Sequence, residues 1–203
     1  GDVISADHQN QSFNVCYPEE SSWNLAQYNG DLNGGDYNIL LIDLSATWCA
    51  PCYNSIPFWE SEEQFWSENY PSVKFLTALS DLDQPYSCQQ WGNAGEPDIP
   101  LIIEDDPGPS GEIMYSWFYE PDFNSYPRYI LVDHTMKVRG KTSGFINDSV
   151  DPCDGGSDQF NGWDGGSIQN FIYQLIDECG EECNTNMLGC TDPSACNYDP
   201  LAS

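Results

Sequence analysis

The sequence predicts an α/β fold with a central mixed β-sheet flanked by helices. Residues 38–46 form a mostly apolar run typical of a buried strand, a helix of about residues 50–69 follows, and residues 73–79 form a second apolar strand. This β-α-β order has a crossover long enough for parallel pairing. Residues 128–133 and 136–140 have the pattern of an antiparallel hairpin, so the sheet is expected to be mixed.

The other segments complete the expected order of elements. Residues 1–37 are predicted to be irregular, apart from a short amphipathic stretch at 23–28. Further predictions are a helix at 85–93, a strand at 99–103, a turn-rich loop at 104–111, a helix at about 111–119 and an Asp/Gly-rich loop at 151–166. A last helix is indicated by apolar residues at helical spacing: Ile168, Phe171, Ile172, Leu175 and Ile176. We therefore expect one domain at 1–180, with its core at about 20–178, and a separate short irregular Cys-rich tail at 181–203.

The net charge of the chain excludes two classes of partner. Thirty-three acidic residues against five basic ones give a net charge of −28. Nucleic acids and anionic membrane surfaces both require a basic binding face. The charge is interpreted as a solubility device, with multivalent cation binding as the alternative. Three of the five bases alternate in one predicted strand, where they are expected to be solvated or paired with acids: Lys137, Arg139 and Lys141.

Nine cysteines in this length indicate an oxidising, extracytoplasmic compartment. No run of about 18 apolar residues is present, so we expect no transmembrane segment. No signal peptide is recognised, and the start at Gly1 is compatible with a mature or trimmed chain. The pairing of the cysteines outside 49–52 is open, with Cys179–Cys183 and Cys190–Cys196 as candidate short loops: Cys16, Cys88, Cys153, Cys179, Cys183, Cys190 and Cys196.

The motif with the clearest chemistry is Trp48-Cys49-Ala50-Pro51-Cys52, directly after the first predicted strand. It holds the one C-x2-C pair of the chain, and the two histidines lie far from each other, which disfavours a zinc site. Cys49 is expected at a helix N-terminus, where free amides and the helix dipole favour a thiolate. Cys49 is therefore the expected nucleophile, Cys52 the resolving thiol, and Pro51 a residue that stiffens the turn between them.

Two neighbours of this motif are candidates for supporting roles. Asp43 is an ionisable residue inside an apolar strand, where burial raises a carboxyl pKa and prepares it to exchange a proton with Cys52. The alternative for Asp43 is a hydrated or capped aspartate at a strand end. Trp48 is either a lid against the cysteine pair or a core aromatic, and the residues alone leave this open.

The stretch 42–52 resembles the thioredoxin superfamily, and its Ala-Pro dipeptide is most like the extracytoplasmic thiol-disulfide oxidoreductase branch (TlpA/ResA-like). The stretch 125–133 is similar to the cis-proline strand of the same superfamily. The resemblance implies a thioredoxin-like three-layer sandwich, with Asp43 as proton relay. It also implies that Pro127 follows a cis bond and that Pro127 and Tyr126 form a substrate-docking edge.

Three departures from the family pattern concern the surroundings of Cys49. Tyr53 stands where a basic residue is usual, Met136 replaces the usual glycine of the hairpin turn, and Tyr126 is bulkier than usual. Arg128, directly after Pro127, is a candidate to replace the missing positive charge near Cys49 and to shape the site.

The last fifteen residues, 189–203, resemble a short Cys/Asp/Asn repeat found at the C-terminus of secreted proteins of marine bacteria. The resemblance implies a truncated repeat and a marine bacterial origin. Calcium is considered for this tail and for 151–158, but neither segment fits the ligand pattern of an EF-hand loop. We otherwise expect no cofactor.

These observations predict an extracytoplasmic thiol-disulfide oxidoreductase that exchanges disulfides with protein substrates through Cys49 and Cys52. Its partners would be protein thiols or disulfides and a redox partner protein, while the direction of exchange and the oligomeric state are not fixed by the sequence. The alternative is a non-catalytic thioredoxin-like binding or structural module of a larger secreted protein. Peroxidase chemistry is disfavoured, because Ala46 occupies the position where a peroxidatic site usually has threonine.

Overall fold

The computed structural model describes residues 1–95, 100–105, 113–119, 125–143 and 168–183. Its centre is a seven-stranded mixed sheet in the order β2-β1-β5-β4-β3-β6-β7. The strands are β1 Phe13–Tyr17, β2 Ser21–Trp23, β3 Ile39–Ala46, β4 Val73–Ser80, β5 Ile102–Glu104, β6 Arg128–Val132 and β7 Val138–Ser143. The three central strands β5, β4 and β3 are parallel, and the outer pairings are antiparallel, which confirms the predicted mixed sheet.

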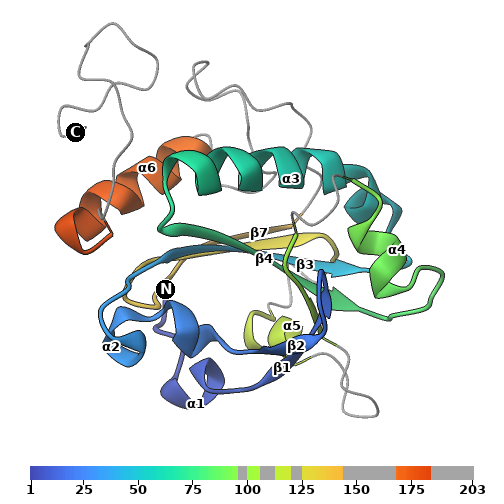
Figure 1. Cartoon of the computed structure of the whole chain (residues 1–203), viewed down its shortest axis with the longest axis horizontal. Coiled ribbons are helices and arrows are strands. Elements are labelled where there is room, and N and C mark those ends of the chain that lie inside the picture. The colour runs from blue at the N-terminus through green and yellow to red at the C-terminus, as the bar shows by residue number, and fades with distance from the viewer. Residues whose placement is uncertain (96–99, 106–112, 120–124, 144–167, 184–203) are drawn as a thin grey trace, which may run out of the picture.

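The sheet is the middle of three layers (Figure 1). Helices α3 (Ala50–Asn69) and α6 (Ile168–Cys179) cover one face, and the short helices α1 (Ala6–Gln9), α2 (Gly30–Asn33) and α5 (Met114–Trp117) lie on the other. Helix α4 (Cys88–Gly92) and two 3₁₀ turns, η1 Leu25–Tyr28 and η2 Gly180–Glu182, complete the order. The predicted arrangement of helices on both sides of the sheet is thus confirmed.

Strand β3 is the structural centre because every one of its residues is buried. Its apolar side chains point alternately to the two faces, so Leu40, Ile42 and Leu44 join the core below the sheet while Ile39 and Leu41 join the core under α3 and α6. Asp43 therefore points toward α3, between Thr77 on β4 and Tyr129 on β6 in the register of the sheet.

The N-terminal prediction is wrong. Residues 1–37 are not an irregular segment, because β1 and β2 extend the sheet beyond β5 and α1, η1 and α2 fold beneath it. Strands of five and three residues are too short to show a period, and four of the five β1 residues are buried, so no alternation marks them. Strand β5 also begins later than predicted, since Pro100 has no amide to donate to a ladder.

Helix α6 has the apolar face that its spacing predicts, with Ile168, Ile172, Leu175 and Ile176 buried in the core under α3. Its C-terminal end is held to β7 by Arg139, whose Nη1 lies 3.1 Å from Asp133 Oδ2 and 2.5 Å from Glu178 Oε2. The Arg139 guanidinium lowers the pKa of Glu178 to about 2. Arg139 is thus paired with acids, as expected for the alternating bases.

The turn of the β6–β7 hairpin carries Met136 in a left-handed conformation, with φ 60°. This conformation is unusual for a residue with a side chain, and glycine adopts it more easily. Met136 is fully buried in the core below the sheet. Burial of its side chain offsets the backbone cost, which explains why methionine is stable where glycine is usual.

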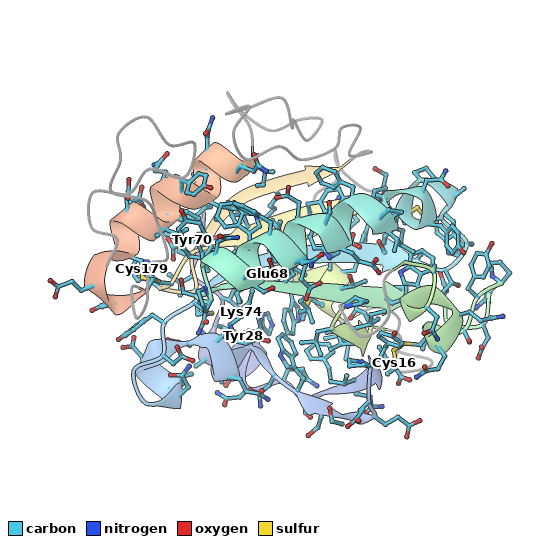
Figure 2. The ribbon with its side chains drawn as sticks, turned by 45° about the horizontal axis from the view of Figure 1, so that its top comes forward. Cys16, Tyr28, Glu68, Tyr70, Lys74 and Cys179 are labelled. Atoms are coloured by element: carbon cyan, nitrogen blue, oxygen red, sulfur yellow. A yellow bond between two sulfur atoms is a disulfide. The ribbon has the colours of Figure 1, made fainter. Side chains whose placement is uncertain are left out.

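Two disulfides tie segments together at opposite ends of the molecule. Cys16 on β1 is bonded to Cys88 at the start of α4, and Cys179 is bonded to Cys183 after α6. Figure 2 shows Cys16 and Cys179 at the two ends of the sheet. The loop 151–166, the tail from residue 184, and Cys153, Cys190 and Cys196 lie outside the described residues. No helix in the described part is long and apolar enough to cross a membrane.

Candidate active site

The cysteine pair lies where β3 gives way to α3. Cys49 and Cys52 form a disulfide, and Cys49 is the N-cap residue of α3, with its Sγ accepting a hydrogen bond of 3.2 Å from the Cys52 amide. Pro51 occupies the first turn, where a missing amide costs nothing. Cys49 is 3% exposed and Cys52 is 1% exposed. Each sulfur is therefore covered by its surroundings, and the free amides of the helix end are next to Cys49.

Trp48 and Tyr126 lie beside the cysteine pair and are together called the rim; Trp48 forms one side of it. It is 55% exposed, so the core alternative for this residue is wrong. Its Nε1 donates a hydrogen bond of 2.5 Å to Asp81 Oδ2, and the Thr47 hydroxyl donates to the Asp81 carbonyl. Asp81 adopts φ 54°, which places it in the left-handed region just after β4. The loop after β4 thus holds the exposed indole in place.

Tyr126 forms the other side of this rim, and the peptide bond between Tyr126 and Pro127 is cis. The Tyr126 ring lies edge-on to Trp48 at 5.7 Å and packs against Tyr115 at 4.7 Å. Its hydroxyl donates to Ser80 Oγ at 3.1 Å. Because Tyr126 also packs against the apolar cluster that contains both cysteines, the structure brings 48, 49, 52, 126 and 127 together at one end of the sheet.

Arg128 is buried on β6 and reaches away from the cysteines. Its Nη1 donates a hydrogen bond of 2.7 Å to the Phe118 carbonyl, and its guanidinium lies 5.1 Å from the ring centre of Tyr115. Among the described residues, Nε and Nη2 of Arg128 have no hydrogen-bond partner. Arg128 therefore contacts Tyr115, which in turn packs on Tyr126. An effect of the Arg128 charge on the Cys49 thiol stays a prediction.

Tyr53 and the Cys16–Cys88 disulfide pack in the same apolar cluster as Cys49 and Cys52. The Tyr53 ring stacks on Tyr86 at 4.7 Å and meets Trp91 edge-on at 5.6 Å. Cys16 and Cys88 belong to the same apolar cluster as Cys49 and Cys52. The position that usually carries a basic residue is therefore occupied here by an aromatic stack.

Asp43 lies on the side of β3 that faces α3. It is 5% exposed, and the Ser45 hydroxyl lies within hydrogen-bond distance of both its carboxyl oxygens, at 2.9 and 2.8 Å. Burial raises the pKa of Asp43 to about 7, against the opposing effect of the Ser45 hydrogen bond. The alternative of a hydrated or capped aspartate at a strand end is wrong, because Asp43 lies inside β3, which continues to Ala46, and its side chain is buried.

A small cavity of about 10 Å³ adjoins Asp43, and Ser55, Glu60 and Thr77 share its lining. Ser55 links the cavity to the cysteine pair, because its hydroxyl donates to the Cys52 carbonyl at 2.8 Å. Sequence reasoning missed Glu60 and Asp81, since 33 acidic residues hide any single one. The available signal for Glu60 is its spacing of four from Ile56, which places an acid on the buried face of α3.

Among the described residues, no three His, Cys, Asp or Glu side chains are grouped so that they could hold a metal ion. The two segments considered for calcium, 151–158 and the tail, lie outside the described residues.

Comparison with known proteins adds a short stretch of sequence similarity. No family model matches the chain. Among curated proteins, the chain is 35% identical over 52 residues to the thioredoxin of Ophiophagus hannah. The match covers 26% of this chain and 46% of the thioredoxin, so the chain spans about half the length of that relative.

Comparison with solved structures covers most of the chain. MTB DsbF, solved in mixed oxidised and reduced forms, has a TM-score of 0.54 at 16% identity, over 87% of this chain and 99% of that one. The exposed lipoprotein thioredoxin Etrx1 of Streptococcus pneumoniae strain TIGR4 has a TM-score of 0.51 at 15% identity, over 83% and 99%. The fold is thioredoxin-like. A secreted Mycobacterium tuberculosis disulfide oxidoreductase homologous to E. coli DsbE shares this thioredoxin-like fold at a TM-score of 0.50 and 10% identity, over 86% and 99%.

Proposed function

We propose that this protein is an extracytoplasmic thiol-disulfide oxidoreductase that exchanges disulfides with protein substrates. The observation that carries the proposal is the Cys49–Cys52 disulfide at the N-terminus of α3, beside the cis Tyr126–Pro127 bond, in a thioredoxin-like fold. Three disulfides among the described residues support an oxidising compartment. A redox partner protein would restore the starting state after each cycle. The Cys-rich tail and the marine bacterial origin remain predictions from the sequence.

The exchange uses the two sulfurs in sequence. In the oxidised form, a substrate thiolate attacks Cys49 Sγ, the Cys49–Cys52 bond breaks, and Cys52 leaves as a thiolate. A second substrate thiolate then attacks the substrate sulfur of the mixed disulfide and releases Cys49. Two electrons pass from the substrate dithiol to the cysteine pair. In the reverse direction, the Cys49 thiolate attacks a substrate disulfide and Cys52 resolves the mixed disulfide.

Asp43 accepts the proton that the Cys52 thiol loses and returns it to the Cys52 thiolate. A thiol must lose its proton to attack, and a leaving thiolate must gain one. Because burial raises the pKa of Asp43 to about 7, its carboxyl group both accepts and returns a proton near neutral pH. Ser55 lines the cavity of Asp43 and contacts the Cys52 backbone, which supports a proton path between the two residues.

Trp48, Pro51, Tyr126, Pro127 and Arg128 shape the place where a substrate docks. Trp48 and Tyr126 contact each other edge-on beside Cys49, which is itself almost fully covered, so docking would have to displace part of this cover. The backbone at 126–127 is the expected docking edge for an extended substrate segment, because a peptide gains main-chain hydrogen bonds on an exposed edge.

Replacement of each cysteine tests this function. Cys49→Ser is expected to abolish the acceleration of insulin reduction by dithiothreitol, since the attacking thiolate at position 49 is absent. Cys52→Ser is expected to accumulate a mixed disulfide on Cys49, visible by mass spectrometry, because the resolving thiol is absent. The Cys179→Ser/Cys183→Ser variant is the matched control and should keep full activity. Unchanged activity of Cys49→Ser, or a wild-type protein whose 49–52 disulfide resists mild reductant and which has no turnover, would contradict the proposal and favour the non-catalytic module.

Arg128→Met is expected to lower the exchange rate with a protein substrate about tenfold, while the rate with a small thiol changes less than about twofold. The reason is that Arg128 supports Tyr115, which in turn packs against Tyr126 at the docking edge. The measurement compares both rates, with circular dichroism as the check on folding. A displaced pH dependence of Cys49 alkylation in this variant would instead show that the Arg128 charge acts on the thiol.

A further inference from the structure

Glu60 is a second buried carboxyl group beside Asp43. It lies on α3, is 2% exposed, and lines the same small cavity as Asp43. The cavity volume of about 10 Å³ is at the lower limit for holding one water molecule, and Asp43, Glu60 and two hydroxyl side chains supply polar groups in its lining. The described lining residues include no Lys, Arg or His. Two acids therefore share one enclosed space without a balancing cation among the described lining residues.

The other side of Glu60 lies against the loop that follows α4. A Cβ atom placed on Gly95 would lie 1.8 Å from Glu60 Oε2, so the glycine backbone approaches the carboxyl group more closely than any other residue allows. Gly95 is half-exposed, and its neighbours Asn93 and Ala94 are exposed. The Glu60 side chain thus extends from the Asp43 cavity to the underside of a surface loop.

The charged surroundings of the pair are acidic as well. Glu63 lies one turn further along α3, and burial, followed by the Glu60 charge, raises its pKa to about 8. Tyr129 on β6 faces Asp43, and burial followed by the Asp43 charge raises its pKa well above the usual range. From β4, the facing residue is the uncharged Thr77. The Glu60 charge thus acts on Glu63 and the Asp43 charge acts on Tyr129, while Asp43 and Glu60 are related by the cavity that both line.

We propose that Glu60 is the proton-transfer partner of Asp43 and connects it with solvent through the cavity and past the backbone of Gly95. This inference rests on the proposed function. When the Cys52 thiol gives its proton to the Asp43 carboxylate, Cys52 attacks the mixed disulfide, the 49–52 bond forms and the substrate thiolate leaves. The Asp43 O–H then breaks as the proton passes through one water molecule in the cavity to the Glu60 carboxylate, and from there to solvent. No electrons move in the relay. Glu60 acts through Asp43 and is a positioning residue.

The test compares two buried acids on the same helix. Glu60→Gln removes the proton acceptor but keeps the shape and hydrogen-bonding capacity of the side chain. Glu62→Gln is the matched control, because Glu62 is 1% exposed, accepts hydrogen bonds from Trp66 Nε1 at 2.8 Å and Gln169 Nε2 at 3.0 Å, and does not line the cavity. The measurement is the rate at which a preformed mixed disulfide on Cys49 is resolved, followed from about pH 5 to about pH 9.

Glu60→Gln is expected to slow this step about tenfold and to change its pH dependence, whereas Glu62→Gln should stay within about twofold of the wild type. Asp43→Asn should slow the step more, on the order of 100-fold, as is typical for a direct proton-transfer group. The Asp43→Asn/Glu60→Gln double variant should match Asp43→Asn alone, because Glu60 acts only through Asp43. Gly95→Ala, which displaces the Glu60 carboxyl group while keeping both acids, should also slow the step.

A second readout does not depend on turnover. The titration of the Asp43 carboxyl group is taken from infrared spectra, as the difference between each protein and its Asp43→Asn form. In Glu60→Gln it should move to lower pH, since a neighbouring negative charge has been removed. In Glu62→Gln it should stay unchanged. Wild-type rate and titration in a folded Glu60→Gln protein overturn the relay. If Asp43→Asn is slow at the same time, the proposed function stands without it. A wild-type protein that forms no mixed disulfide overturns both proposals.

Discussion

Asp43→Asn is expected to raise the free energy of unfolding by about 4 kcal/mol at about pH 9. Burial raises the pKa of Asp43 from 3.8 to about 7, and a shift of about three units corresponds to about 4 kcal/mol between the two protonation states. Because the folded state holds the proton more tightly than the unfolded chain, this stability is fully present below about pH 4 and is lost as the pH rises through about 7. Above that pH the wild type carries a buried charge, and the amide removes it.

Urea unfolding of the oxidised protein across this pH range measures the effect. The stability of the wild type should fall toward high pH, with Glu63 contributing in the same direction because burial and the Glu60 charge raise its pKa to about 8. Asp133→Asn is the control of opposite sign. Burial alone would raise the pKa of Asp133, but hydrogen bonds from Thr135, Lys137 and Arg139 outweigh it and lower the pKa. Asp133→Asn should therefore destabilise the protein at neutral pH. Parallel pH profiles of the wild type and Asp43→Asn would contradict the assignment.

Removal of the Cys16–Cys88 disulfide is expected to cost about 4 kcal/mol of unfolding free energy. The bond closes a loop with a sequence separation of 72, so its loss in Cys16→Ser/Cys88→Ser releases a large chain entropy in the unfolded state. The Cys179–Cys183 bond spans a separation of only 4, and its double serine variant should lose about 2 kcal/mol. Both are measured by urea unfolding with the 49–52 pair oxidised.

The comparison between the two bonds decides the interpretation. Equal losses would show that local packing, and not loop length, sets the contribution of Cys16–Cys88. This bond joins β1 to α4 within the apolar cluster of the cysteine pair. The Cys16→Ser/Cys88→Ser variant should therefore also unfold at a lower temperature than the wild type.

The parts of the fold that the sequence predicted are those with a strong and uninterrupted pattern. Strands β3 and β4 are long apolar runs around a 20-residue helix, and the chain from Met136 to Lys141 alternates charged residues with uncharged ones. The N-terminal strands were not predicted because they are short. In addition, β1 forms a strand through pairing with β5, which is 85 or more residues away in the sequence. Long-range pairing of this kind leaves no local signal.

The candidate site could be predicted in its chemistry but not in its surroundings. The spacing of Cys49 and Cys52, the acid in β3 and the proline at 127 are local patterns. The structure brings the cysteines and Pro127 together at one end of the sheet and links Asp43 to Cys52 through Ser55. The direction of Arg128 could not be predicted, because it depends on the position of Tyr115 and Phe118 after chain folding. Glu60 and Asp81 were hidden for the same reason, since their roles come from the burial of one carboxyl group and the contact of the other with an indole.

The exposed indole beside the cysteine pair also gives the protein a built-in optical reporter. Among the described tryptophans, Trp48 alone is exposed, and it is bonded directly to Cys49 in the chain. A disulfide quenches the fluorescence of a neighbouring indole, and reduction relieves that quenching. Among the described tryptophans, acrylamide reaches Trp48 most easily and the half-buried Trp117 less so, and the Trp48 share of the emission would report the oxidation state of the 49–52 pair.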